Sequence, residues 1–227
     1  MKNFFRTEWK KIREMNASEK RWYIWEYYKL HIFGFILVSF VVGSFLNAWL
    51  NPPRDEYLHI AWLAGVIPFE YLDNISHGLE VIVEDPERQA VIVIDYSATG
   101  NPQFDVANQT RFMAMMQIGG IDVFISSWEG VEELANEQLL RPIDGVMEAL
   151  SASNPALFSR LYPEVRPVTF TRFPEEITVT ETRAIPLTDS GFFEEIGINT
   201  NDLFLTVVFS STRYDAIAKT LEVLLYD

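Results

Sequence analysis

The chain is 227 residues long and strongly acidic, with 32 Asp and Glu against 18 Lys and Arg, and it contains no cysteine. This charge argues against nucleic acid and anionic lipid headgroups as partners, because like charges repel. The lack of cysteine excludes disulfides and thiolate chemistry.

The first distinctive stretch is an apolar run at residues 32–50, IFGFILVSFVVGSFLNAWL, which holds no charged residue. As a helix it is about 28 Å long, close to the hydrocarbon thickness of a bilayer. Backbone amides in lipid must be satisfied within the segment, so we expect a transmembrane helix. A buried core helix usually carries a polar stripe, and a cleaved signal peptide has a shorter apolar region. The pattern therefore favours an uncleaved signal anchor, followed by a short, stiff linker at residues 51–56.

The charges on either side of this run predict its orientation. Lys and Arg outnumber Glu in residues 1–31, whereas the part after the run is strongly acidic. By the positive-inside rule, we expect residues 1–31 to be a cytoplasmic, juxtamembrane segment and residues 57–227 to be an extracellular domain of a single-pass cell-membrane protein. Aromatic residues suited to the headgroup region flank the run: Trp22, Tyr23, Trp25, Tyr27, Tyr28 and Trp49.

Two features of this amino-terminal part suggest finer structure. Asn16 followed by Glu19 resembles a capping box, so a helix can start there and continue into the membrane. Ser39 and Gly43 form a small-xxx-small pair, with Gly34 a little more than one turn earlier. Such residues let a second helix approach closely, and we expect an integral-membrane partner.

The domain that follows alternates strands with helices. We expect apolar strands at residues 58–64, 90–96 and 121–125, each followed by a helix, at residues 69–78, 104–118 and from Ser126 or Ser127 to about Asn136. Residues 79–83 fit either a continued helix or an edge strand. This alternation predicts an α/β domain with an open, mostly parallel sheet. Right-handed crossovers then bring the three strand ends to one edge of the sheet, where ligands bind in such folds.

The remaining elements are less regular. We expect short helices at residues 146–152 and 154–161, antiparallel strands at 169–173 and 177–182, a buried strand at 203–209, and a closing helix at 214–226.

Several stretches resemble extracellular solute-binding proteins. They are IDVFISSWEGVEELANEQLLRPID at residues 121–144, with its LLRPID turn, and AIPL followed by DLFLTVVFSSTRYDAIAKTLEVLL near the end. The WEYYK pattern before the anchor is similar to membrane-tethered versions from Gram-positive bacteria. The resemblance implies a fold of the periplasmic-binding-protein type. Members of that family have two lobes of comparable size, so residues 145–200 would form a reduced second lobe.

The resemblance also implies a cleft along the sheet edge. Its lining would be Trp62, Gly65, Ser97, Thr99, Ser126, Ser127 and Trp128, with Asp189 and Ser190 from the second lobe. Hydroxyls and helix-start amides suit small polar or anionic groups, and tryptophan offers a stacking wall. The alternative is purely structural: Ser126 and Ser127 as helix caps, and Trp62 and Trp128 as core residues.

No pattern in the sequence favours catalysis, a metal or a cofactor. His31, His59 and His77 lack the spacing of metal ligands, and there is no nucleophile elbow or phosphate-binding glycine loop. The stretch from Asp95 resembles a calcium loop but has Val106 where a bidentate Glu is required. We therefore expect a non-catalytic accessory subunit of a larger membrane complex for transport. The alternative is a tethered receptor that delivers a small polar solute to a permease.

Overall fold

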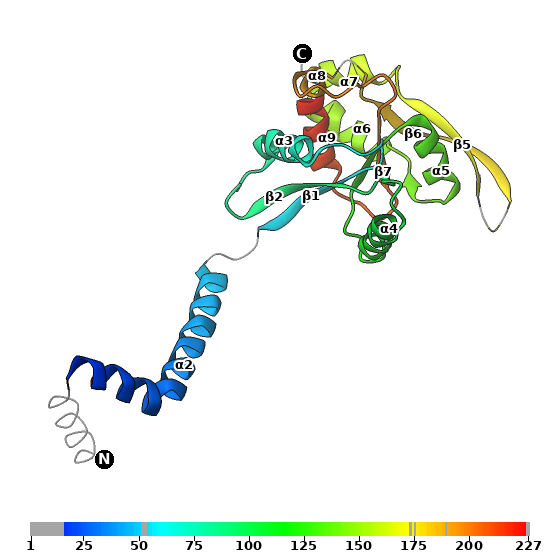
Figure 1. Cartoon of the computed structure of the whole chain (residues 1–227). Coiled ribbons are helices and arrows are strands. Elements are labelled where there is room, and N and C mark those ends of the chain that lie inside the picture. Colours follow the sequence, from blue (N-terminus) through cyan, green and yellow to red (C-terminus); the bar gives the residue numbers. More distant parts are fainter. Residues whose placement is uncertain (1–15, 51–53, 173, 175, 189, 226–227) are drawn as a thin grey trace. The chain divides into compact units, whose positions relative to one another are not determined.

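The computed structural model describes residues 16–50, 54–172, 174, 176–188 and 190–225 (Figure 1). The chain divides into two compact units, with the boundary between Pro53 and Arg54.

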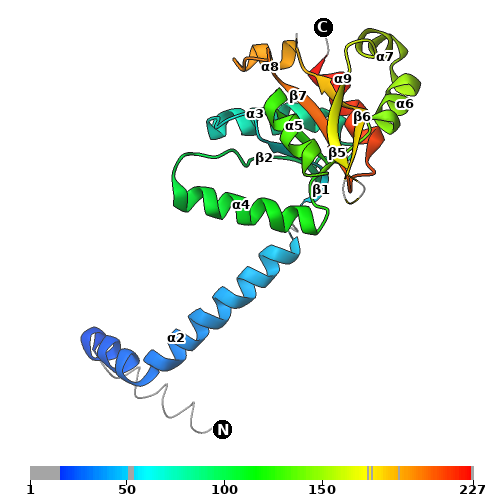
Figure 2. The same ribbon diagram turned by 90° about the vertical axis from the view of Figure 1, so that its right-hand side faces the viewer.

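The first unit is dominated by helix α2, Ala17–Leu50. The predicted capping box is confirmed, because Asn16 Oδ1 accepts from the Glu19 amide at 2.9 Å and Glu19 Oε2 accepts from the Asn16 amide at 3.1 Å. These two bonds satisfy backbone donors that the first helical turn leaves free. Both views show a bend in α2 between its charged amino-terminal part and its apolar remainder (Figures 1 and 2).

The stretch Tyr28–Leu50 of α2 is long and apolar enough to cross a membrane, and the mean hydropathy of its most apolar 18 residues is 2.0. Its large side chains point into open space: Phe35 and Phe45 are each 74% exposed. A core helix of a soluble protein would bury such side chains, whereas no described residue buries them here.

The predicted linker is shorter than expected. Residues 51–53 lie outside the described residues, and strand β1, Asp55–Trp62, already includes positions 55 and 56. The reason is that the Asp55 amide donates to the Arg88 carbonyl at 2.6 Å, so the pairing of β1 begins at Asp55.

The second unit is built on a seven-stranded sheet in the order β2-β1-β3-β7-β6-β5, with β4 also paired to β7. Strands β1, β2 and β3 are parallel, and the pairs β3–β7, β4–β7, β6–β7 and β5–β6 are antiparallel. Besides β1, the strands are β2 Gln89–Asp95, β3 Val123–Ser126, β4 Leu140–Arg141, β5 Arg166–Arg172, β6 Ile177–Pro186 and β7 Phe204–Val208. The sheet is therefore mixed, and the prediction of a mostly parallel sheet was wrong.

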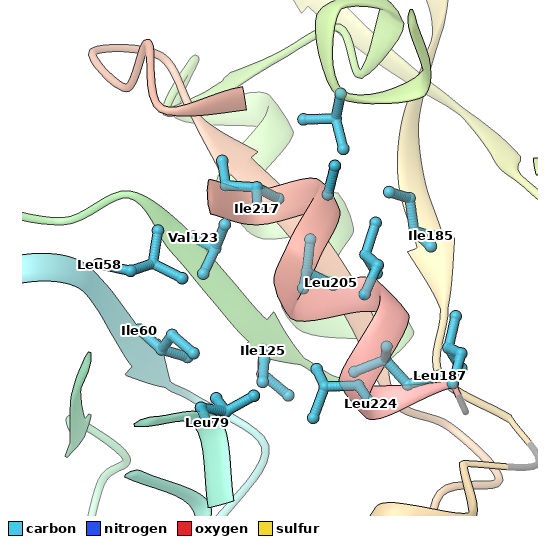
Figure 3. Close-up of a cluster of buried hydrophobic side chains, with 14 of the residues drawn as sticks. Leu58, Ile60, Leu79, Val123, Ile125, Ile185, Leu187, Leu205, Ile217 and Leu224 are labelled. Carbon is cyan, nitrogen blue, oxygen red and sulfur yellow. The ribbon is translucent and has the colours of Figure 1, made fainter. Parts of the chain in front are cut away.

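Helices cover both faces of this sheet (Figure 2). Those bounding the first face are α3 Phe69–Leu79, α6 Asp144–Ser153, α7 Pro155–Leu161 and α9 Tyr214–Leu224, and those on the second are α4 Pro102–Gln117 and α5 Trp128–Asn136. Each face of the sheet carries a hydrophobic core, called the first and the second core after the face on which it lies. Neighbouring strand residues alternate between the faces, so that Leu58 and Ile60 face the first core and Ala61 faces the second. Figure 3 shows the first core, where Ile217 and Leu224 of α9 lie over Val123, Ile125 and Leu205 of the sheet.

The ambiguous residues 79–83 adopt neither predicted structure. Helix α3 ends at Leu79, and a single 3-10 turn, η1 Glu80–Ile82, follows it. The Val83 amide bonds the Glu80 carbonyl at 3.0 Å, which closes this turn. Ile82 and Val83 are buried, so their apolar character reflects packing rather than strand pairing.

Residues 145–200 do not form a second lobe, contrary to the prediction. Strands β5 and β6 add to the same sheet, where Ala184 of β6 pairs with Thr206 of β7. The short helix α8, Gly191–Glu195, packs Phe193 into the first core. These segments complete one core instead of building another, and Arg54–Asp227 is a single compact unit.

Candidate functional site

The three parallel strands end side by side, as predicted. Trp62 at the end of β1 is in register with Asp95 of β2 and with Ile125 of β3. Ser126, the last residue of β3, pairs with Phe204 at the start of β7. The loops after these strands therefore share one edge of the sheet, and we take this edge as the candidate site.

Trp62 is a core residue rather than the wall of a cleft. It is 1% exposed, its ring meets Phe193 edge-on at 6.1 Å between centroids, and its Nε1 donates to the Gly65 carbonyl at 2.8 Å. Its polar atom is satisfied within the loop that follows its own strand.

A hydrogen-bonded loop brings Gly65 and Ser97 together. The Gly65 amide donates to Ser97 Oγ at 3.2 Å, and Gly65 has a φ of +103°, in the region that favours glycine. Asp95 Oδ1 accepts from the Ser97 amide at 2.8 Å, and its Oδ2 accepts from the Ile67 amide at 3.3 Å. Asp95 thus ties two edge loops to each other, a role that the sequence analysis missed. The feature of the sequence that could have revealed this role is a carboxylate at the end of an otherwise apolar strand.

Thr99 is exposed and lies in the loop before α4. Its amide and its Oγ1 donate to Asp105 Oδ1 at 2.6 and 2.7 Å. These hydrogen bonds, the side-chain one first, lower the pKa of Asp105 below its ordinary value. Asn101 caps the helix by accepting from the Gln103 amide at 3.2 Å. Both the amide and the hydroxyl of Thr99 are therefore bonded to Asp105, a side chain of α4.

The third loop combines a cap with a surface aromatic. Ser127 is the N-cap of α5 and accepts from the Gly130 amide at 3.4 Å. This is the helix-capping role that was the structural alternative to ligand binding. Trp128 is half-buried; its Nε1 donates to Glu132 at 2.8 Å, and its ring meets Phe204 edge-on. The Arg166 guanidinium lies over both rings, 5.7 Å from the Trp128 centroid and 5.0 Å from that of Phe204.

Ser126 differs from its neighbours because its buried Oγ has no hydrogen-bond partner among the described residues. Ser190, by contrast, is the N-cap of α8, donates to the Leu224 carbonyl and accepts from the Phe193 amide. Asp189 lies outside the described residues. Within the predicted lining, hydrogen bonds join Gly65 to Ser97. Among the described residues of that lining, only Ser126 keeps a buried side-chain polar atom without a hydrogen-bond partner.

A buried polar cluster lies elsewhere, at residues that sequence reasoning did not connect. Asp122 accepts from the His59 amide at 3.0 Å, from Ser211 Oγ at 2.8 Å and from Arg213 Nη1 at 3.0 Å. Because the bond to His59 is made by its backbone, the imidazole does not join Ser211 and Asp122 in a proton relay. The cluster joins β1, the start of β3 and the end of β7, which explains why no local pattern predicted it.

The His59 ring is buried and stacks on Tyr96 at 6.3 Å, and neither ring nitrogen has a hydrogen-bond partner among the described residues. Glu56 Oε2 is 3.9 Å from Nδ1, too far for a hydrogen bond. Burial lowers the pKa of His59 to about 4, outweighing the opposing effects of Asp122 and of the Gly120 backbone. The described residues contain no group of three or more His, Asp or Glu side chains arranged to hold a metal ion.

The chain matches no protein-family model, no curated protein and no solved structure.

Proposed function

We propose that this chain is a non-catalytic, single-pass membrane protein, an accessory subunit of a larger membrane complex of the transporter kind. The observation that carries the proposal is Tyr28–Leu50, a helical stretch of membrane length whose large apolar side chains are exposed among the described residues. The positive flank before it and the acidic domain after it favour a cytoplasmic amino terminus and an extracellular domain.

The edge of the sheet supports a subunit role over solute capture. The hydroxyls and amides that a ligand would need are mostly bonded within the chain, as in the Asp95–Ser97–Gly65 loop. A ligand would have to break those bonds, which lowers its net gain on binding. The three parallel strands ending at this edge are the feature that supports a solute-binding-like ancestry for the domain.

The anchor offers a face on which a partner helix can pack. In a regular helix, Ser39 and Gly43 lie about 40° apart around the axis, whereas Gly34 lies about 140° to 180° from them. The predicted packing set is therefore reduced to Ser39 and Gly43. A Cβ built on Gly43 or on Gly34 meets nothing within 4 Å, so neither glycine is required by the fold of the chain itself.

This asymmetry gives a matched test. Purified from its own cells in mild detergent, the full chain should bring down a stoichiometric multi-span protein. Gly43→Leu should lower its recovery several-fold by blocking close helix approach, while Gly34→Leu, on the opposite side, should leave it unchanged. A wild-type chain that always elutes alone contradicts the proposal, and equal loss in both variants contradicts the packing face.

The tethered receptor for a small polar solute remains the second candidate, favoured by the unpaired Ser126 Oγ at the sheet edge. A thermal-shift screen of the full chain with amino acids, sugars and short peptides tests it, because saturating ligand stabilises a receptor by a few kcal/mol. A shift that disappears in Ser126→Ala supports the receptor. A flat response across the screen removes it.

A further inference from the structure

A groove of about 940 Å³ lies on the first face of the domain, between η1, α8 and α9. Both views show α3, which leads into η1, on the same side of the sheet as α8 and α9 (Figures 1 and 2). The volume falls within the range of roughly 300–1,000 Å³ that small-molecule sites occupy. Among the residues that the structure describes, none of those predicted to bind ligand lines it.

The walls of the groove are apolar and partly exposed. Val81 of η1, Phe192 of α8 and Val223 of α9 all line it, and Val81 is 75% exposed. Phe192 is half-buried and is held edge-on against Phe193, 5.6 Å between centroids. The groove therefore offers an apolar surface and a fixed aromatic ring to an apolar body.

The charged residues of the lining are mainly acidic. Glu84, Glu195 and Glu222 face a single lysine, Lys219, whose Nζ lies 3.8 Å from Glu84 Oε1. Glu222 accepts from the Ser153 hydroxyl at 2.5 Å, a neutral partner that leaves its charge uncompensated. After the Lys219–Glu84 pair, the lining retains the two negative charges of Glu195 and Glu222.

We propose that this groove binds a small organic cation with a bulky apolar body, such as a quaternary or protonated amine. The apolar walls hold the body, the Phe192 ring attracts the positive charge through its face, and Glu195 and Glu222 complement that charge. An anionic or neutral ligand of the same size is stabilised only by its contacts with the apolar walls. This inference does not depend on the accessory-subunit proposal, since it concerns a different site.

A second groove provides the control for general acidity. It lies against α6 and α7, has a volume of about 360 Å³, and is lined by Asp144 and Glu148 together with apolar residues. A cation attracted only by the net charge of the domain responds equally to the loss of a carboxylate at either place. A cation bound in the η1–α8–α9 groove responds to Glu195 and not to Glu148.

The experiment is isothermal titration of the full chain in phosphatidylcholine nanodiscs, with empty nanodiscs subtracted. The probes are tetraphenylphosphonium and tetraphenylborate, which have similar size and shape but opposite charge. We expect one saturable phosphonium site, with Kd weakened about fivefold in Glu195→Gln and further in Glu195→Gln with Glu222→Gln, and unchanged in Glu148→Gln. Phe192→Leu, checked for folding by its melting temperature, should also weaken binding.

Three results overturn the inference. They are tetraphenylborate binding as tightly as tetraphenylphosphonium, Glu148→Gln weakening the site as much as Glu195→Gln, and the absence of saturable phosphonium binding by the wild-type chain. Glu195 is exposed, so its replacement by glutamine leaves the fold intact and the comparison valid.

Discussion

Asp122 joins three segments of the chain that lie far apart in the sequence. Its carboxylate accepts hydrogen bonds from β1, from Ser211 and from Arg213, and Arg213 Nη1 also donates to the Tyr57 carbonyl at 3.0 Å. Asp122 is 5% exposed. A buried carboxylate with this many donors cannot be removed without leaving those donors unpaired.

We therefore expect Asp122→Ala to lower the free energy of unfolding by about 3 kcal/mol. Urea denaturation of the full chain in nanodiscs, followed by tryptophan fluorescence, measures the change. Glu87→Ala removes an exposed carboxylate before β2 and should change stability by less than about 0.5 kcal/mol. Equal effects of the two substitutions would show that Asp122 does not join these segments energetically.

His59 should make the domain sensitive to mild acid. Its pKa is lowered from 6.5 to about 4 by burial, so the unfolded chain binds the proton more tightly. The stabilisation by neutral His59 is therefore complete above pH 6.5 and is lost as the pH falls toward 4. Between pH 7.5 and pH 5 this amounts to about 2 kcal/mol.

Replacing His59 by Phe keeps a ring against Tyr96 and removes the titration. The charged groups around His59, namely Glu56, Asp122, Arg111 and Arg213, are the same in both proteins, so the difference between the two pH profiles isolates the imidazole. We expect the variant to lose about 2 kcal/mol less between pH 7.5 and pH 5. Parallel profiles would contradict a neutral buried imidazole.

Individual site residues were the hardest to predict from sequence. Ser127 was correctly foreseen as a cap, and Trp62 as a possible core residue, because the alternatives for each were local. Asp122 and Asp95 were missed because each accepts a hydrogen bond from a segment far away in the sequence, Asp122 from His59, Ser211 and Arg213 and Asp95 from Ile67. A hydroxyl or carboxylate has several ways to be satisfied, and only the tertiary fold decides which one applies.

Among the elements, α4 depends on the hydrogen bonds between Asp105 in its first turns and the loop before it. Thr99 and Asp105 close the loop before the helix, and of the residues of α4 only Met116 is fully buried. We expect Asp105→Ala to speed amide hydrogen exchange in α4 several-fold while leaving the other helices unchanged. Because the pKa of Asp105 is lowered, its stabilisation is present above its ordinary pKa and lost as the pH falls below it, so acid should act on wild-type α4 in the same way.

The comparison variant is Asp73→Ala, which removes an exposed carboxylate from α3. Its exchange pattern should match that of the wild type. If Asp105→Ala instead accelerates exchange throughout the domain, the Thr99–Asp105 bonds stabilise the whole fold and not α4 alone.

Elements with strong local patterns were predicted well, and long-range pairing was not. The three strand–helix pairs up to Asn136 were found because an apolar run, a turn and a helix-forming stretch recur in order. Residues 145–200 were assigned to a second lobe because nothing local shows that β6 pairs with β7. The register of antiparallel strands depends on neighbours that the chain reaches only later.

At the scale of the whole molecule, the topology can be tested because the chain has no cysteine. A single cysteine at exposed Asn74 of the domain, as Asn74→Cys, should react with a membrane-impermeant maleimide on intact cells. Ser18→Cys, in the exposed start of α2, should react only after lysis. The reverse pattern of labelling would place the domain in the cytoplasm and remove the proposed extracellular role.

The continuity of the seven-stranded sheet has a consequence for how this domain can respond to a ligand. Two-lobed receptors swing shut about a hinge, but strands that share one hydrogen-bonded ladder from β2 to β5 have no hinge to swing on. A ligand that binds the domain therefore changes the chemistry of its surface and does not close one lobe onto another. Small-angle scattering of the full chain should therefore give the same radius of gyration with and without a bound cation.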